Sequence, residues 1–430
     1  MNILDKKQEE MVIENMGYIE TISRRELGLY IHIPFCVRKC EYCDFLSAPG
    51  TEEMKKEYVE ALLNEIGSYH GRTSDYIVPT IFFGGGTPSC ISEEDICRIM
   101  DAIRQTFVIS EEQLEATIEV NPGTVTKEKL LGYRRAGINR ISFGLQSTDN
   151  NELKCLGRIH CYEDFVQNYS LARELGFHNI NVDLMSALPR QTEASWENTL
   201  RTVAELEPEH ISAYSLIIEE GTGFYERYRP GAAYEKDLPD EETDRRIYYR
   251  TKELLERYGY RRYEISNYAK KGYVCRHNDS YWVGTEYLGL GLGASSLLGG
   301  ARFSNLHDLK KYITLCNQLK PNNLEQYSDK NDDKISSSMA EDPLEIRINN
   351  NYLTREEQME EFMFLGLRRC EGISKDVFLR RFEESIEAIF GHVLIQLEQK
   401  KLIENSGNWI RLTEYGIDVS NSVLSEFLFN

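Results

Sequence analysis

No run of about 18 consecutive apolar residues occurs in this 430-residue sequence, so we expect no helix that spans a membrane. The first twenty residues, MNILDKKQEEMVIENMGYIE, lack the apolar core of a signal peptide, which predicts a cytoplasmic protein. Positive charge is also scarce, because 50 Lys and Arg stand against 70 Asp and Glu, a formal net charge of −20. Nucleic acid binding needs a basic surface, so we expect no nucleic acid partner.

Three of the ten cysteines lie within eight residues, in the segment CVRKCEYC that contains Cys36, Cys40 and Cys43. In a reducing compartment such a cluster favours a metal over disulfides. Structural zinc prefers four protein ligands, and no second C-x2-C follows downstream. Zinc with His32 as fourth ligand is the alternative, although we expect His32 to pack or hydrogen-bond within its strand. Three thiolates instead favour a [4Fe–4S] cluster whose fourth iron is open to a small chelating molecule.

Apolar runs alternate with amphipathic helical segments between residues 28 and 260. The strand-like runs are LGLYIHIPF, TIFFGG, ATIEVNP, RISFGLQS, INVDLMS and HISAYSLII. Nearly continuous apolar strands that alternate with helices indicate a parallel sheet covered by helices. Because a closed eight-unit barrel would need two more units, we predict an open six-unit β/α barrel, with a doubly wound sheet as the alternative. Chemistry is expected where the strands end.

The rest of the chain differs from this barrel, residues 28–260, in composition. Residues 1–27 form a polar lead segment, and residues 261–317 form a Tyr/Gly-rich extension. Its stretch 263–296 predicts loops or short strands and not a helix. Residues 318–354 are predicted to be a polar linker. Residues 355–430 are predicted to form a small helical, winged-helix-like domain, a module that often binds DNA but here lacks a basic patch. A docking role for this domain is one hypothesis.

The cysteine segment resembles the C-x3-C-x-aromatic-C signature of radical S-adenosylmethionine (SAM) proteins. In that superfamily the amino and carboxylate groups of SAM fill the vacant position of a three-cysteine [4Fe–4S] cluster. The segments GGGTPS, EVNPGT, RISFGLQS, LGRIH, YEISNYA and HNDSYW resemble, in this order, the HemW family of haem chaperones. That family is related to HemN, the oxygen-independent coproporphyrinogen III oxidase. The resemblance covers the chain to about residue 300, and more loosely to the C-terminus.

Further positions match the SAM site of the superfamily. Glycines without Cβ allow the main chain to approach a ligand closely, and a guanidinium suits the SAM carboxylate. A carboxylate at a strand end can accept from a ribose hydroxyl or an ammonium group. Each position alone has a structural alternative, such as a tight turn or an N-cap. The matching positions are Tyr30, Tyr42, Gly85, Gly86, Thr87, Glu119, Gln146, Arg158 and Asp183.

The segment HNDSYW resembles the HNxxYW motif that is associated with haem binding in HemW. The resemblance implies that His277 ligates haem iron, with Tyr281 and Trp282 packed on the macrocycle. The alternatives are a structural core histidine and, as a competing ligand, the thiolate of Cys275. Phe45 stands where the oxidase has an additional cysteine, which argues against oxidation of coproporphyrinogen III. A radical enzyme that acts on a porphyrin is the alternative function.

The resemblance also implies partners. Haem-accepting proteins such as respiratory cytochromes are expected, with reduced flavodoxin or ferredoxin as electron donor. The SAM site is expected either to be regulatory or to run a slow radical reaction. The expected location is the cytoplasm, with peripheral membrane association only through partners.

Overall fold

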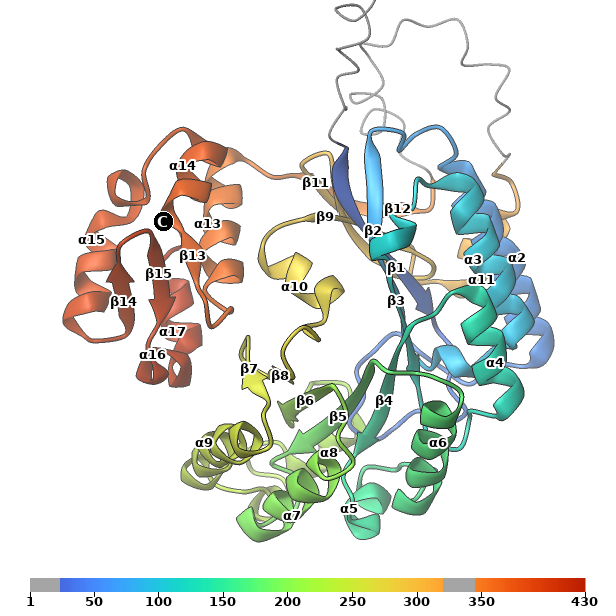
Figure 1. Ribbon diagram of the computed structural model, residues 1–430, viewed down its shortest axis with the longest axis horizontal. Helices are drawn as coiled ribbons and strands as arrows, with labels where there is room; N and C mark the ends of the chain where they lie inside the picture. The colour runs from blue at the N-terminus through green and yellow to red at the C-terminus, as the bar shows by residue number, and fades with distance from the viewer. Residues whose placement is uncertain (1–23, 320–344, 430) are drawn as a thin grey trace, which may run out of the picture.

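Six parallel strands form the centre of the molecule and follow one another in chain order across one sheet (Figure 1). The computed structural model describes residues 24–319 and 345–429. Each strand pairs in parallel with the next. The six strands are β1 (Arg25–Ile33), β2 (Tyr76–Gly85), β3 (Glu115–Val120), β4 (Arg140–Gln146), β5 (Ile180–Ser186) and β6 (His210–Ser215).

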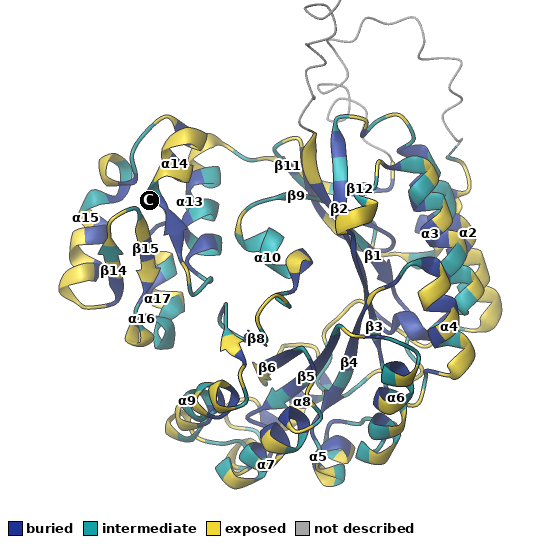
Figure 2. Cartoon of the chain, viewed as in Figure 1, coloured by how far each residue is buried: buried dark blue, intermediate teal, exposed yellow. Residues whose placement is uncertain are grey.

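The sheet is not closed. β1 has β2 and β9 (Glu286–Leu290) as neighbours, whereas β6 has β5 and β8 (Asn267–Ala269). The predicted open six-unit arrangement is therefore confirmed. The central parallel strands β2–β5 are mostly dark in Figure 2 because both of their faces are covered, as in other parallel sheets.

Helices follow the strands and cover the outer face of the sheet (Figure 1). They begin where short polar side chains accept backbone N–H groups, as Thr51, Ser92 and Thr126 do. Gly137 ends α4 in the left-handed region at φ 87°, which suits glycine. The helices are α2 (Glu52–Ser68), α3 (Glu93–Thr106), α4 (Lys127–Ala136), α5 (Asn150–Cys155), α6 (Tyr162–Glu174), α7 (Glu193–Ala204), α8 (Gly223–Tyr228) and α9 (Glu241–Arg257), with short 3-10 turns η1 (Pro88–Cys90), η2 (Glu111–Gln113) and η3 (Glu235–Asp237).

The Tyr/Gly-rich segment after the barrel extends the sheet at both edges. Beyond β6 lie β8 and β7 (Arg261–Arg262), and beyond β9 lie β10 (Ser295–Leu298), β11 (Ala301–Asn305) and β12 (Arg347–Tyr352). β12 belongs to the end of the predicted linker, and it pairs antiparallel with β11. Linker residues 320–344 and lead residues 1–23 lie outside the described residues.

The prediction that residues 263–296 contain no helix is wrong, because α10 lies within them. HNDSYW lies in α10 (Arg276–Trp282), and α11 (Leu309–Cys316) follows later. A tertiary contact stabilises α10. Glu115 of β3 accepts hydrogen bonds from the backbone N–H groups of Arg276 and His277 at 3.2 and 3.1 Å. A carboxylate from a distant strand thus satisfies the first turn of a seven-residue helix.

The C-terminal residues form a separate domain with its own apolar core, as predicted (Figure 1). Its small sheet has the order β13-β15-β14, and the β14–β15 hairpin corresponds to the predicted wing. The domain meets the rest of the chain through ion pairs, such as Arg369 with Asp279 of α10 at 2.8 Å. Its elements are α13 (Arg355–Gly366), β13 (Ile373–Ser374), α14 (Lys375–Phe382), α15 (Ile386–Gln399), β14 (Ile403–Ser406), β15 (Trp409–Leu412), α16 (Glu414–Asp418) and α17 (Ser420–Ser425).

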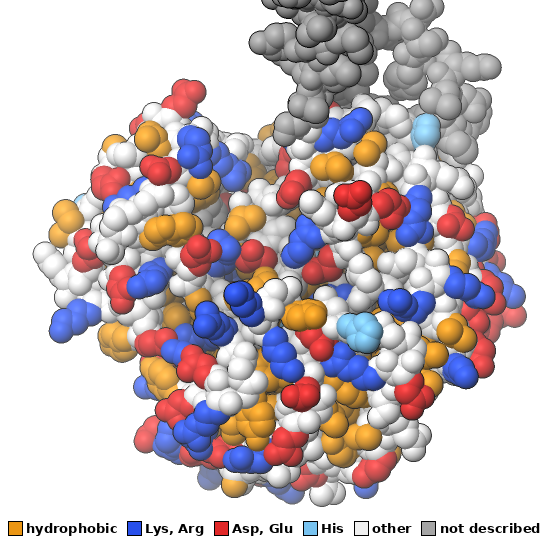
Figure 3. Space-filling view, in the orientation of Figure 1, with side chains coloured by type: hydrophobic (Ala, Val, Ile, Leu, Met, Phe, Trp, Pro, Cys, Tyr) orange, Lys and Arg blue, Asp and Glu red, His pale blue; other side chains and the backbone are white. Residues whose placement is uncertain are grey.

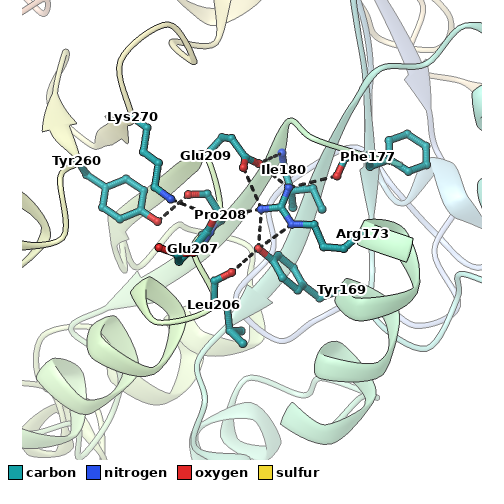
Figure 4. Close-up of polar contacts among 10 residues, drawn as sticks. All are labelled: Tyr169, Arg173, Phe177, Ile180, Leu206, Glu207, Pro208, Glu209, Tyr260 and Lys270. Atoms are coloured by element: carbon teal, nitrogen blue, oxygen red, sulfur yellow. Dashed lines mark hydrogen bonds and ion pairs between the residues drawn. The ribbon is translucent and has the colours of Figure 1, made fainter. Parts of the chain in front are cut away.

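A network of hydrogen bonds links the chain segments at the amino ends of β5 and β6 (Figure 4). Arg173 of α6 donates to both carboxylate oxygens of Glu209 at 2.8 and 3.1 Å, to the Tyr169 hydroxyl, and to the carbonyls of Phe177 and Glu207. The Tyr169 hydroxyl in turn donates to the carbonyl of Leu206. This network lies at the end of the strands opposite to the predicted site.

The visible surface mixes both charges. Figure 3 shows Lys and Arg side chains interspersed with Asp and Glu over barrel and C-terminal domain. Within the described part of the chain, no helix combines the length and apolar character required to cross a membrane.

Candidate functional site

The three predicted cluster cysteines lie on one loop that follows β1. The loop is closed at its base, because the Cys36 N–H donates to the Ala48 carbonyl at 3.1 Å and the Ala48 N–H donates to Pro34 at 3.0 Å. The Cys43 N–H donates to the Cys40 carbonyl at 3.3 Å. Cys36, Cys40 and Cys43 are all partly exposed and carry free thiols. The loop therefore presents all three sulfurs within one short closed segment.

Two predicted SAM-site residues contact these sulfurs. Thr87 donates its hydroxyl to the Cys36 sulfur, and Arg158 donates from Nη1 to the Cys40 sulfur, both at 3.6 Å. Asn121 joins them, since its amide donates to the Thr87 hydroxyl at 2.8 Å and accepts from Arg158 at 2.6 Å. Donors that face the two sulfurs help to orient them. Asn121 lies in the segment EVNPGT, in which only Glu119 was predicted to belong to the site.

The donor set fits a three-cysteine cluster better than zinc. Among the described residues, no group of three His, Cys, Asp or Glu side chains, the three cysteines included, is arranged to hold a metal ion. His32, the alternative fourth ligand, uses Nε2 with the Leu46 carbonyl at 2.9 Å and Nδ1 with the Tyr30 hydroxyl at 3.2 Å. Its burial lowers the pKa of the ring, so the ring is neutral. His32 thus hydrogen-bonds in place, as the sequence favoured, and three thiols remain as the donor set.

Gly85 and Gly86 are required by close backbone packing. A Cβ on Gly85 would lie 2.5 Å from the His32 ring, and one on Gly86 would lie 2.7 Å from the Phe35 carbonyl oxygen. Gly85 also has a φ of 107°, which side chains rarely adopt. In this structure the two glycines approach the cysteine loop, so the end of β2 and this loop form one unit.

Two predicted carboxylates lie on β3 and β5. Glu119 is the penultimate residue of β3, whereas Asp183 lies in the middle of β5 and not at its end. Asp183 accepts from the Ser142 hydroxyl and from the Asn181 amide, both at 2.8 Å. Burial and the negative charge of Asp183 raise the pKa of Glu119 to about 8. Glu119 is therefore largely protonated at neutral pH and can donate as well as accept a hydrogen bond. Burial and the charge of Glu119 also raise the pKa of Tyr30.

The remaining predicted SAM-site residues, Gln146 and Tyr42, are held in place by the fold. Gln146 ends β4 at a φ of 76°, a left-handed backbone that is uncommon outside glycine, and its side chain is buried. Tyr42 packs edge-on against Phe224 with a centroid distance of 6.1 Å. Tyr42 therefore anchors the cysteine loop to α8.

A cavity of about 520 Å³ lies beside the cysteine loop. One wall comes from the loop, with Phe45 and Leu46, and a second wall contains Glu119 at the end of β3. The opposite wall is mostly apolar and comes from α10, β9–β11 and α13. It includes Tyr281, Trp282, Leu297, Arg302 and Leu365. A cavity of this volume is large enough for a cofactor.

His277, the predicted haem ligand, does not reach this cavity. It is 1% exposed, and its Nδ1 and Nε2 form hydrogen bonds with the hydroxyls of Thr80 at 2.9 Å and Tyr281 at 2.8 Å. Its ring stacks on Phe82 at 5.2 Å, and burial and the charge of Arg140 lower its pKa to about 3. His277 therefore occupies the position of a satisfied core histidine, with Tyr281 between it and the cavity.

Cys275, the competing ligand, is fully buried. Burial raises the pKa of its thiol to about 12, so it is not a thiolate at neutral pH. Its sulfur donates to the Glu115 carboxylate at 3.7 Å. This thiol helps to hold the start of α10.

The sequence matches two described families. Residues 30–203 match the radical SAM superfamily, and residues 353–419 match the HemN C-terminal domain. The haem chaperone HemW of Bacillus subtilis is 37% identical over 93% of this chain and 98% of its own length. HemW of Haemophilus influenzae is 36% identical over 94% of this chain and 98% of its own. The solved structure of the coproporphyrinogen III oxidase HemN from Escherichia coli has the same fold, with a TM-score of 0.75, 23% identity, and coverage of 94% of this chain and 91% of HemN.

Proposed function

Because this chain belongs to the HemW family of haem chaperones, we propose that it binds a [4Fe–4S] cluster, SAM and haem, and passes haem to acceptor haem proteins. The observation that carries this proposal is the cavity of about 520 Å³ between the cysteine loop and α10. One ligand in this cavity would contact both Phe45 of the loop and Trp282 of α10.

Cys36, Cys40 and Cys43 are the proposed cluster ligands, with SAM at the open iron. When bound, the cluster supplies an electron to SAM. The chain positions both, since Thr87 and Arg158 fix the orientation of two sulfurs. The proposed SAM contacts are those that match the superfamily, namely Tyr30, Tyr42, Gly85, Gly86, Thr87, Glu119, Gln146, Arg158 and Asp183.

Haem is proposed to occupy the cavity with its macrocycle against Tyr281 and Trp282. Ligation by His277 remains part of the proposal and requires one local change. The Tyr281 hydroxyl bonds the Nε2 atom of His277, and the Tyr281 side chain lines the cavity. Displacement of that side chain would turn Nε2 toward the cavity, and the neutral ring is the form that binds iron.

The apolar cavity wall favours the chaperone over the oxidase. Phe45 is 62% exposed and lines the cavity at the position where the oxidase has an additional cysteine. An exposed aromatic ring suits contact with a flat macrocycle more than redox chemistry. Respiratory cytochromes as acceptors, flavodoxin or ferredoxin as electron donor, and a cytoplasmic or membrane-peripheral location remain further parts of the proposal.

Hemin titration of the cluster-reconstituted chain tests the haem site. We expect hemin to bind with a shifted Soret band. His277→Ala should lower the affinity for hemin at least about tenfold, because iron ligation would be lost. Tyr281→Phe is the matched control, because it removes only the hydroxyl that holds Nε2. It should bind hemin as well as the unchanged protein or better. An unshifted Soret band in the unchanged protein would refute haem binding.

A further inference from the structure

A second cavity of about 150 Å³ adjoins the large one at the boundary with the C-terminal domain. Trp282, Leu297 and Leu365 line both cavities. The small cavity also contains Arg381 of α14 and Glu361 of α13. Together the two cavities therefore have a mostly apolar body and a charged end formed by the C-terminal domain.

Arg381 differs from the other arginines of this junction. Arg302 is occupied, because it donates to both Glu361 oxygens at 2.6 and 2.7 Å and to the Tyr287 hydroxyl at 3.1 Å. Arg368 lies over the Trp282 ring at 4.6 Å. Arg381 lies over the Phe382 ring at 5.4 Å, but it forms no ion pair or hydrogen bond with any other residue that the structure describes.

Two carboxylates, Glu361 and Glu286, interact electrostatically with Arg381. Both of them form hydrogen bonds with other groups. Glu361 pairs with Arg302. Glu286 accepts from the Tyr76 hydroxyl at 2.6 Å, from Arg25 at 3.3 Å and from the Gly299 N–H at 2.6 Å. A guanidinium at a cavity wall without its own anion is a site for a carboxylate ligand.

We propose that Arg381 binds a propionate carboxylate of the tetrapyrrole, whose macrocycle lies against Trp282, Leu297 and Leu365. This inference rests on the proposed haem function. It adds Arg381 as the residue that binds a carboxylate of the ligand. The macrocycle contacts come from α10, β10 and α13, whereas the carboxylate contact comes from α14. Bound tetrapyrrole therefore bridges the barrel extension and the C-terminal domain.

Full-length protein is titrated with hemin and with hemin dimethyl ester, which lacks the free carboxylates. Arg381→Gln is compared with Arg380→Gln, the preceding arginine on the same helix; both arginines are exposed, but Arg380 lines neither cavity. We expect Arg381→Gln to lose about tenfold in hemin affinity and to bind the ester like the unchanged protein. Arg380→Gln should bind both ligands like the unchanged protein. The melting temperature of Arg381→Gln should change little, because only the contact with the Phe382 ring is lost within the described chain and no ion pair or hydrogen bond.

Equal hemin affinity of Arg381→Gln and Arg380→Gln, with hemin binding retained, would overturn the role of Arg381 and leave the proposed function standing. An equal loss for the ester and for hemin would also overturn it, since the carboxylates would then not be read. Absence of hemin binding by the unchanged protein would overturn both proposals.

Discussion

The two ends of the parallel strands use polar residues in opposite ways. At the amino ends, Arg173 donates hydrogen bonds to Glu209, to Tyr169 and to two carbonyl groups (Figure 4). At the carboxyl ends, Arg158 has a buried Nε without a partner in the described structure, and burial together with the nearby Asp183 raises the pKa of Glu119. Unsatisfied atoms alone do not separate the two ends, because Arg140 Nε and Asn179 Oδ1 at the amino ends also lack partners in the described structure. The ends differ in the network around Arg173 at one and in the raised pKa of Glu119 beside the cysteine loop at the other.

The largest predicted difference between the two ends is in the free energy of unfolding. Arg173→Met should lower it by about 3 kcal/mol, because a partly buried carboxylate and several acceptors lose a charged donor. Cys40→Ala should change the free energy of unfolding by less than about 1 kcal/mol in cluster-free protein, because the Cys40 sulfur accepts one long hydrogen bond, from Arg158, within the described structure. The same substitution should abolish iron incorporation. Urea unfolding and iron analysis measure both. Equal destabilisation by the two variants would break the comparison.

The second prediction concerns Glu119 and pH. Its folded pKa of about 8 lies above the ordinary value of 4.5, so the carboxyl group takes up a proton on folding. Its contribution to stability is therefore full below about pH 4.5 and is lost as the pH rises to about 8. Glu119→Gln, which does not titrate, should be more stable than the unchanged protein by about 1–2 kcal/mol at pH 8, with cavity water limiting the effect. Near pH 5 the two proteins should be alike.

Asp183→Asn sharpens this test. It removes the negative neighbour that raises the pKa of Glu119, so the stability of this variant should depend less on pH between 5 and 8. Unfolding in urea across this range measures both variants. A Glu119→Gln advantage that is equal at pH 5 and pH 8 would mean that Glu119 does not titrate as described.

The smallest predicted effect concerns exposed charge at the amino ends. Arg25 and Asp75 form an ion pair at 2.7 Å with side chains 52% and 41% exposed. Asp75→Asn should cost about 0.5 kcal/mol, because water screens such pairs, and the cost should shrink in high salt. Thermal unfolding at low and high salt measures it. A cost near that of Arg173→Met would show that burial does not decide the energy of these pairs.

Local sequence patterns were sufficient to predict the strands and the cysteine loop. Apolar runs such as LGLYIHIPF became buried parallel strands, and short polar residues such as Ser92 and Thr126 begin the helices between them. These features depend on neighbours in the chain. They are therefore visible before the fold is known.

Features that depend on distant residues could not be predicted in this way. α10 forms because Glu115 of β3 satisfies its first turn, and His277 is buried because Thr80 and Tyr281 bond its two nitrogens. The importance of Asn121 appears only when β3 brings it between Thr87 and Arg158. None of these contacts leaves a periodic signal in the sequence.

Electron paramagnetic resonance of the reduced, iron-reconstituted protein, recorded without and with SAM, tests the central claim most directly. A three-cysteine cluster with an open iron should give a [4Fe–4S]⁺ signal that changes when SAM is added, and Cys40→Ala should give none. A signal that is indifferent to SAM, or bound zinc in place of iron, would contradict the account.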